Sequence, residues 1–178
     1  LLEKIASNIT EVDAALAKKW LPVRRQESHK GTYGHVAVAG GAHGMLGAPI
    51  LTACGALKSG TGLVTVVSVP EIMLPLACNQ PELMCRQLIT PAGYLTAENL
   101  PEIADFIKDK VLALGMGLGR NPETMALVHK LCQAEMRGLV LDADGLQALA
   151  QQPLNFKNCG FPVVLTPHPK EMAALLGV

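Results

Sequence analysis

The sequence predicts an α/β fold with a mainly parallel central sheet, and three observations support this class. Short apolar runs rich in valine, leucine and alanine recur along the chain, with helix-like segments between them. The runs are continuously apolar rather than alternating, which is typical of strands buried on both faces of a parallel sheet. Turns rich in glycine or proline follow several runs, as expected where a strand passes into a helix. We therefore expect helices on both faces of the sheet.

The first strand and helix are predicted between residues 35 and 57. Residues 35–39 (HVAVA) form a short apolar run that ends at a pair of glycines. Apolar residues then recur at helical spacing over residues 46–57, and Pro49 falls near the first turn, where proline is tolerated. The β-branched run at residues 63–67 (LVTVV) predicts the second strand.

The rest of the chain continues this alternation after one looser stretch. Residues 70–81 contain three prolines and are predicted to be irregular. Residues 95–108 are helix-like, and residues 121–123 (NPE) have the cap, first-turn proline and early acid of a helix start. The remaining strands are predicted at residues 111–114, 139–141 and 163–165, the last two followed by helix signals.

The amino-terminal part does not follow this rhythm. Residues 9–20 predict one amphipathic helix, and the polar run at residues 22–30 predicts an exposed connection. We therefore divide the chain into a linker with an amino-terminal helix, residues 1–29, and a single domain, residues 30–178. The sequence contains no internal repeat.

Composition and charge exclude several classes of protein. The 178 residues include 15 basic and 15 acidic ones, and 49% are hydrophobic, which argues against disorder and against a nucleic-acid partner. Aromatic residues make up 3%, too few for a surface on which bases stack. No apolar stretch reaches the ~20 residues of a membrane span, so we expect no membrane partner.

The cysteines indicate a cytoplasmic protein. The five cysteines lie far apart and form no C-x-x-C pair, so we expect reduced thiols packed in the core and no zinc site.

Two glycine-rich turns are candidate sites for an anionic ligand. Residues 40–49 (GGAHGMLGAP) lead into a helix, whose first N–H groups suit an anion, and residues 115–119 (GMGLG) follow another strand. Since ligands of open parallel sheets bind beyond the carboxyl ends of the strands, the two turns predict a shared floor for a large ligand. Arg120 would then meet a phosphate or, alternatively, solvent. The glycines are equally compatible with tight turns that need a positive φ.

The turns match neither familiar nucleotide-binding motif. The spacing of the Rossmann glycines is absent, which argues against an ordinary NAD-linked dehydrogenase, and no P-loop is present.

Two aspartates follow the predicted strand at residues 139–141. If Asp142-Ala143-Asp144 is extended, both carboxylates point into the crevice and can hold Mg²⁺ through water. Asp144 also stands three residues before Gln147, the spacing of a capping box, so it is equally well interpreted as an N-cap. We favour Asp142 for the site.

The run Thr166-Pro167-His168-Pro169 follows the last predicted strand. Pro169 fits the first position of a helix, and Glu171 then occupies the third, from which it can cap the helix start. His168, held between two prolines, is a candidate binding residue, with a surface histidine in a rigid turn as the alternative. His43, inside the first glycine turn, is left unassigned.

Together and in this order, the motifs resemble the ADP/ATP-dependent NAD(P)H-hydrate dehydratases, the carboxy-terminal domains of YjeF-type repair proteins. The resemblance extends from about residue 24 to residue 178 and includes the runs 30–34 (KGTYG) and 81–84 (PELM). It implies a three-layer, ribokinase-like fold. It also implies a lyase that uses ADP or ATP, with Mg²⁺, to return the hydrated cofactors NADHX and NADPHX to NAD(P)H by phosphorylation and elimination.

The resemblance also suggests roles for individual residues. It implies that Ala48, Gly117 and His168 contact the hydrated dinucleotide, and that Asp142 and Glu171 lie near the metal. The other expected contacts, from the two glycine turns, are Gly41, Gly115 and Gly119. Lys170 departs from the family pattern, which has glycine there.

The extent of the chain leads to further expectations. The chain ends at Val178, before the lysine-glycine segment and the catalytic aspartate of the family, so we expect the amino-terminal part of the domain, with the catalytic aspartate beyond Val178. The linker-like start matches a protein with a preceding NAD(P)H-hydrate epimerase domain, and we expect a homo-oligomer. Two alternatives stay open: a ribokinase-like kinase of a vitamin-type alcohol, and a truncated ligand-binding domain without catalytic activity.

Overall fold

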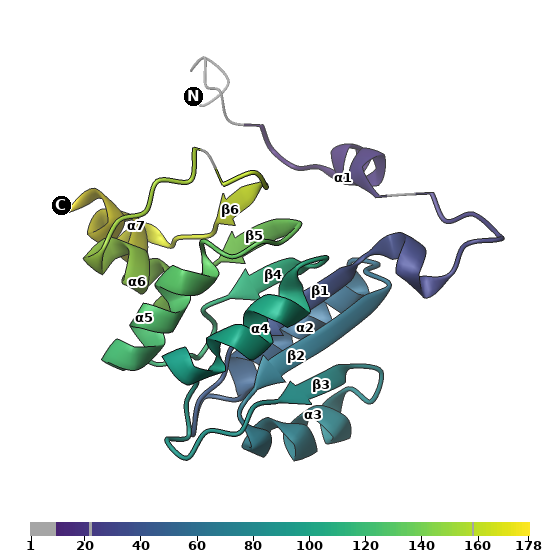
Figure 1. The fold of residues 1–178 in the computed structure, drawn as a ribbon. Coiled ribbons are helices and arrows are strands. Elements are labelled where there is room, and N and C mark those ends of the chain that lie inside the picture. Colours follow the sequence, from purple (N-terminus) through teal and green to yellow (C-terminus); the bar gives the residue numbers. More distant parts are fainter. Residues whose placement is uncertain (1–9, 22, 158) are drawn as a thin grey trace, which may run out of the picture.

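A single parallel sheet organises the molecule (Figure 1). The structure is a computed structural model that describes residues 10–21, 23–157 and 159–178. Six strands lie in the order β3-β2-β1-β4-β5-β6, and all five pairings are parallel. The predicted α/β class and parallel sheet are confirmed.

The strands alternate with helices along the chain. The strands are β1 (His35–Ala39), β2 (Leu63–Ser68), β3 (Met84–Gln87), β4 (Val111–Leu114), β5 (Gly138–Leu141) and β6 (Val163–Leu165). The α-helices are α1 (Ala14–Trp20), α2 (Gly47–Lys58), α3 (Met73–Asn79), α4 (Leu100–Ile107), α5 (Pro122–Leu131), α6 (Asp144–Gln151) and α7 (Pro169–Leu176). Short 3₁₀ turns occupy Lys30–Tyr33, Pro70–Ile72 and Ala97–Asn99.

The core lies on both faces of the sheet, which explains why the strands are apolar without alternation. Ala37 and Ala39 of β1 belong to the core under α4, α5 and α6, whereas Val38 belongs to the core under α2 and α3. Ile103, Val128 and Leu146 bury their side chains on the first face, and Ile50, Ala53 and Leu76 on the second. Each fully buried leucine or isoleucine stabilises the fold by roughly 1.5–3 kcal/mol.

The prediction of irregular structure over residues 70–81 is wrong. A 3₁₀ turn and the helix α3 occupy residues 70–79, and the edge strand β3, which was not predicted, follows at Met84–Gln87. Pro75 lies in the first turn of α3, where its missing N–H costs no helical hydrogen bond. The strand β3 (MCRQ) contains no β-branched residue, so composition gave no strand signal.

The predicted amino-terminal helix is shorter than expected. Helix α1 begins after Asp13, whose carboxylate accepts a hydrogen bond from the N–H of Leu16 at 2.7 Å. Residue 9 of the prediction lies outside the described residues. The predicted helix at 95–108 is likewise reduced to the turn Ala97–Asn99 and α4.

The segment at residues 23–33 is more firmly attached than an exposed connection would be. Arg24 donates a hydrogen bond to the carbonyl of Gly60 at 2.9 Å, and its guanidinium carbon lies 4.5 Å from the centre of the Tyr33 ring. The carbonyl of Tyr33 accepts from the N–H of Gly62 at 3.1 Å. The side chains are mostly exposed, as predicted, but the backbone is fastened to the start of β2. Residue 22 lies outside the described residues.

The cysteines correct one further prediction. All five are free thiols, but only Cys132 is buried and Cys78 is exposed, so packing of all the thiols in the core is wrong. Burial raises the pKa of the Cys132 thiol to about 12. Among the helices that the structure describes, none combines the length and apolar character that a membrane crossing requires.

Candidate functional site

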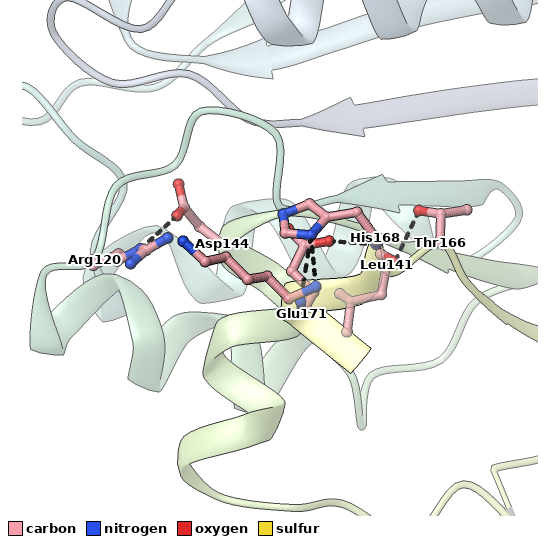
Figure 2. Close-up of polar contacts among 7 residues, drawn as sticks. Arg120, Leu141, Asp144, Thr166, His168 and Glu171 are labelled. Atoms are coloured by element: carbon pink, nitrogen blue, oxygen red, sulfur yellow. Dashed lines mark hydrogen bonds and ion pairs between the residues drawn. The ribbon is translucent and has the colours of Figure 1, made fainter. Parts of the chain in front are cut away.

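The turns that follow β1, β4, β5 and β6 meet at one edge of the sheet, and Figure 2 shows those after the last three strands. The N–H of Gly41, in the first glycine turn, donates to the carbonyl of Met116, in the second, at 3.0 Å. The N–H of Thr166 donates to the carbonyl of Leu141 at 3.2 Å, which joins the turns after β5 and β6. Residues that are far apart in the sequence are thus held side by side.

Two glycines are required because protein backbone passes close to them. A Cβ on Gly115 would lie 1.9 Å from the carbonyl oxygen of Asp142, and one on Gly117 would lie 2.5 Å from that of Met45. Both residues have a positive φ, 126° for Gly115 and 67° for Gly117. The tight turns with positive φ that the sequence allowed for these glycines are therefore present in the structure.

Gly41 packs against a buried hydroxyl at the end of β2. A Cβ on Gly41 would lie 2.6 Å from Oγ of Ser68. Ser68 is fully buried, and its hydroxyl has no hydrogen-bond partner among the described residues. This polar atom lies under the first glycine turn, and no motif in the sequence points to it.

The two aspartates after β5 do not lie on an extended segment, so that prediction is wrong. Strand β5 ends at Leu141 and α6 begins at Asp144, and Ala143 between them adopts φ 48° and ψ −120°. A positive φ is costly for a residue with a Cβ, so this turn is strained. The interpretation of Asp144 as the N-cap is also wrong, because Ala143 holds that position and no side chain caps the helix.

Asp144 instead binds the second glycine turn and the arginine directly after it, and Figure 2 shows the contact with Arg120. Its Oδ2 accepts from the N–H of Gly119 at 3.0 Å, and its Oδ1 accepts from Nε of Arg120 at 3.1 Å. The Asp144 side chain is only 15% exposed, whereas that of Arg120 is 69% exposed. The half-buried Asp142 carboxylate makes no hydrogen bond to the described residues, so the two aspartates differ in their roles.

The start of α7 is capped by Glu171, as the sequence predicts, and also by His168 at the N-cap. Its Nδ1 accepts from the N–H of Lys170 at 3.1 Å, and the carboxylate of Glu171 accepts from the N–H of His168 at 2.9 Å. Pro169 occupies the first turn. The His168 side chain is 60% exposed, which leaves the ring accessible at the edge of the site (Figure 2).

The carboxylates do not form a closed metal site by themselves. The described residues contain no group of three or more His, Cys, Asp or Glu side chains that could hold a metal ion. Both oxygens of Glu171 face His168, one at 2.9 Å from its N–H nitrogen and the other at 3.4 Å from Nε2. Of the carboxylates of Asp142, Asp144 and Glu171, that of Asp142 is the one without a hydrogen bond to the described residues.

A pocket of about 280 Å³ adjoins the two glycine turns. It is lined by the first turn, by a loop at residues 92–94 and by the second turn. The N–H of His43 donates to the carbonyl of Gly93 at 2.7 Å, which fastens the loop to the first turn. No sequence pattern points to this loop or to Tyr94 within it, because no spacing motif relates residue 94 to residue 43.

The family model for NAD(P)H-hydrate dehydratase matches residues 36–178.

The chain belongs to the NAD(P)H-hydrate dehydratase family.

Individual relatives agree with this assignment. The bifunctional NAD(P)H-hydrate repair enzyme Nnr of Moorella thermoacetica is 42% identical over 166 residues, which cover 92% of this chain and 31% of that protein. The ADP/ATP-dependent NAD(P)H-hydrate dehydratase of Bacillus subtilis, co-crystallized with ATP/Mg²⁺, is 29% identical with a TM-score of 0.74. That match covers 97% of this chain and 58% of the solved one.

The ribokinase-like fold expected from the resemblance is confirmed. A ribokinase-like superfamily protein from Enterococcus faecalis superimposes with a TM-score of 0.78 at 22% identity, covering 92% of this chain and 55% of that one. The chain thus spans about a third of the length of the bifunctional relative and just over half of the solved dehydratase.

Proposed function

We propose that this protein takes part in the nucleotide-dependent dehydration of hydrated NADH and NADPH, with ADP or ATP as the co-substrate. The family supports this reaction over the phosphorylation of a vitamin-type alcohol. The names of its relatives include a repair enzyme for NAD(P)H hydrates and an ADP/ATP-dependent dehydratase.

The observation that carries the proposal is the proximity of Ala48 and Gly117 in a chain of this family. A Cβ on Gly117 would lie 3.6 Å from the Cβ of Ala48, so the two residues line one surface. Ala48 is exposed near the start of α2, and the exposed ring of His168 follows β6 on the same edge of the sheet. We assign contacts with the hydrated dinucleotide to these three residues.

The glycine turns would supply backbone donors to phosphate oxygens. Gly41 and Gly119 already donate their N–H groups to Met116 and Asp144. Gly44 and Gly117 donate no hydrogen bond to the described residues, so their amides are better placed to meet a ligand. Gly41, Gly115 and Gly119 would then shape the floor of the site.

The proposed reaction removes water without oxidation or reduction. The hydroxyl oxygen of the hydrated ring loses its proton to a base and attacks the terminal phosphorus of the nucleotide, and ADP leaves from ATP or AMP from ADP. Phosphate then departs with the electrons of the carbon–oxygen bond, and a proton leaves the neighbouring carbon, which restores the ring double bond. Positioning of the reactants and electrostatic stabilisation together contribute most of the catalysis in such phosphoryl transfers.

Mg²⁺ would neutralise phosphate charge in this reaction. Asp142 fits a role beside it, holding water bound to the ion, since its carboxylate makes no hydrogen bond to the described residues. Glu171 would first have to release His168 before it could bind near the metal.

The proposal is tested by incubating the full gene product with NADHX, Mg²⁺ and either ADP or ATP. Recovery of the absorbance of the reduced nicotinamide, with release of inorganic phosphate, is the expected result. A stable phosphorylated product would instead indicate a kinase. Failure to recover NADH with either nucleotide would contradict the proposal.

Three further expectations concern a preceding domain, the oligomeric state and the location in the cell. The bifunctional relative supports a preceding NAD(P)H-hydrate epimerase domain, which an intact mass of the gene product would reveal. A homo-oligomer in the cytoplasm stays a prediction, and light scattering together with cell fractionation would test it.

A further inference from the structure

The Asp144 carboxylate connects the start of α6 to the second glycine turn. It binds Gly119, which is 25 residues away in the sequence, and Arg120, which is 24 residues away. Both carboxylate oxygens are used, one by the Gly119 N–H and the other by Nε of Arg120. Hydrogen bonds to a carboxylate are stronger than those between neutral groups, and here they act on the backbone and on the side chain of adjacent residues. Asp144 therefore fixes both the conformation of the turn and the direction of the Arg120 side chain.

Stability alone does not account for the Arg120 contact. The Arg120 side chain is 69% exposed, and solvent around the guanidinium weakens its ion pair with the 15% exposed Asp144, so the contact contributes little to folding. The contact with Asp144 uses Nε, and the two Nη groups make no hydrogen bond to the described residues. This leaves the end of the guanidinium, the part that binds phosphate with two parallel hydrogen bonds, available to a ligand.

Arg120 also lines the pocket of about 280 Å³ beside the glycine turns. Its other lining residues include His43 and Tyr94, and none of them is acidic. Pockets that enclose a complete drug-sized ligand have volumes of about 300–1,000 Å³, so this one suits a phosphorylated part of a larger ligand. The half-buried Tyr94 offers an apolar wall for a sugar or base.

We infer that Arg120, oriented by Asp144, binds a phosphate group of a ligand seated in this pocket between His43 and Tyr94. Both the hydrated dinucleotide and the nucleotide co-substrate carry phosphate esters and diphosphates, so the inference rests on the proposed function and deepens it. Arg120 is the residue that contacts the anion, and Asp144 is a positioning residue.

The first experiment measures binding without turnover. The full gene product is titrated with inorganic diphosphate by calorimetry in the absence of Mg²⁺. We expect Arg120→Gln to weaken binding by about tenfold or more, because a charged hydrogen bond to phosphate is lost, and Arg120→Lys to keep part of the affinity. Arg137→Gln is the matched control, since Arg137 is exposed and directly precedes β5 at the opposite edge of the sheet.

The second experiment separates positioning by Asp144 from a purely structural role. Asp144→Asn keeps an acceptor for the Gly119 N–H and removes the charge that faces Arg120. We expect it to weaken diphosphate binding in the wild-type background but to cause no further loss in Arg120→Gln. Equal losses in both backgrounds would contradict the positioning role.

Steady-state kinetics identify the source of the phosphate. In Arg120→Gln, a higher KM for NADHX with little change in kcat assigns the phosphate to the dinucleotide, and a higher KM for ADP assigns it to the co-substrate. Absence of diphosphate binding to the wild type, or equal binding to wild type and Arg120→Gln, would overturn the inference even if the dehydratase reaction proceeds. Arg120-dependent binding without any NADHX turnover would instead refute the proposed function and leave the anion site standing.

Discussion

At the scale of single residues, the site depends on glycines that make room for the protein's own backbone. The Met45 carbonyl oxygen lies only 2.5 Å from the position that a Cβ of Gly117 would take, so the two glycine turns pack backbone against backbone. Backbone that packs this closely cannot yield as a flexible side chain does. The glycines therefore fix the shape of the floor before any ligand binds.

This contact predicts a large effect of one methyl group. Gly117→Ala should lower the free energy of unfolding by about 1–3 kcal/mol, since alanine resists the positive φ and its Cβ overlaps the Met45 carbonyl. Gly55→Ala is the matched control, because Gly55 lies within α2 with open space around its Cβ position. It should raise stability by about 0.5–1 kcal/mol. Urea titrations followed by circular dichroism measure both, and a Gly117→Ala protein as stable as the wild type would show that the turns can separate.

At the scale of elements, the start of α7 combines a structural and a binding role in one side chain. Nδ1 of His168 accepts from the backbone of Lys170 and Glu171, so His168 both begins the helix and presents its exposed ring to the site. Because Nδ1 accepts these bonds, the ring proton resides on Nε2, the nitrogen that faces Glu171.

Two substitutions separate these roles. His168→Ala removes the acceptor and should lower stability by about 1 kcal/mol, whereas His168→Asn supplies a favoured N-cap and should leave stability nearly unchanged. If the ring binds the hydrated dinucleotide, the KM for NADHX should rise in both variants. Thermal unfolding and steady-state kinetics give the two readouts. Normal KM values in His168→Asn would mean that His168 acts only as a cap.

The helix starts also show which parts of the structure could be predicted from the sequence. The starts of α5 and α7 were predictable because their signals are local: a capping side chain, a proline and an early acid within four residues. Helix α3 and strand β3 were not, since Pro75 is harmless only in a first turn and a short edge strand needs little β propensity. The partnership of Asp144 with Gly119 and Arg120 was likewise unpredictable, because it depends on how β4 and β5 are placed side by side.

At the scale of the whole molecule, charge is balanced, so acid sensitivity near neutral pH should come from particular groups. The chain has 15 basic and 15 acidic residues. The pKa of His35 is displaced, and this histidine lies at the start of β1, at the opposite end of the strand from the glycine turn. Its Nε2 is 2.8 Å from Oγ1 of Thr65, and its ring meets the Phe106 ring edge-on, with 5.8 Å between centres. The Lys110 ammonium lies 4.5 Å from the centre of the same Phe106 ring.

This arrangement predicts how global stability depends on pH. Burial, and secondarily the positive charge of Lys110, lower the pKa of His35, while Asp109 opposes them. The unfolded chain therefore takes up a proton on His35 at a higher pH than the folded chain does, so stability falls as the pH drops through about 6.5 and below. The neighbouring lysines lower the pKa of Asp105 and of Asp109, so these carboxylates lose their stabilising charge only at more acidic pH, below about 4.

Between about pH 7.5 and about pH 5.5, urea midpoints should thus fall for the wild type and fall less for His35→Gln, which keeps a polar side chain that can reach Thr65. Equal losses in the two proteins would show that folding does not restrict protonation of His35.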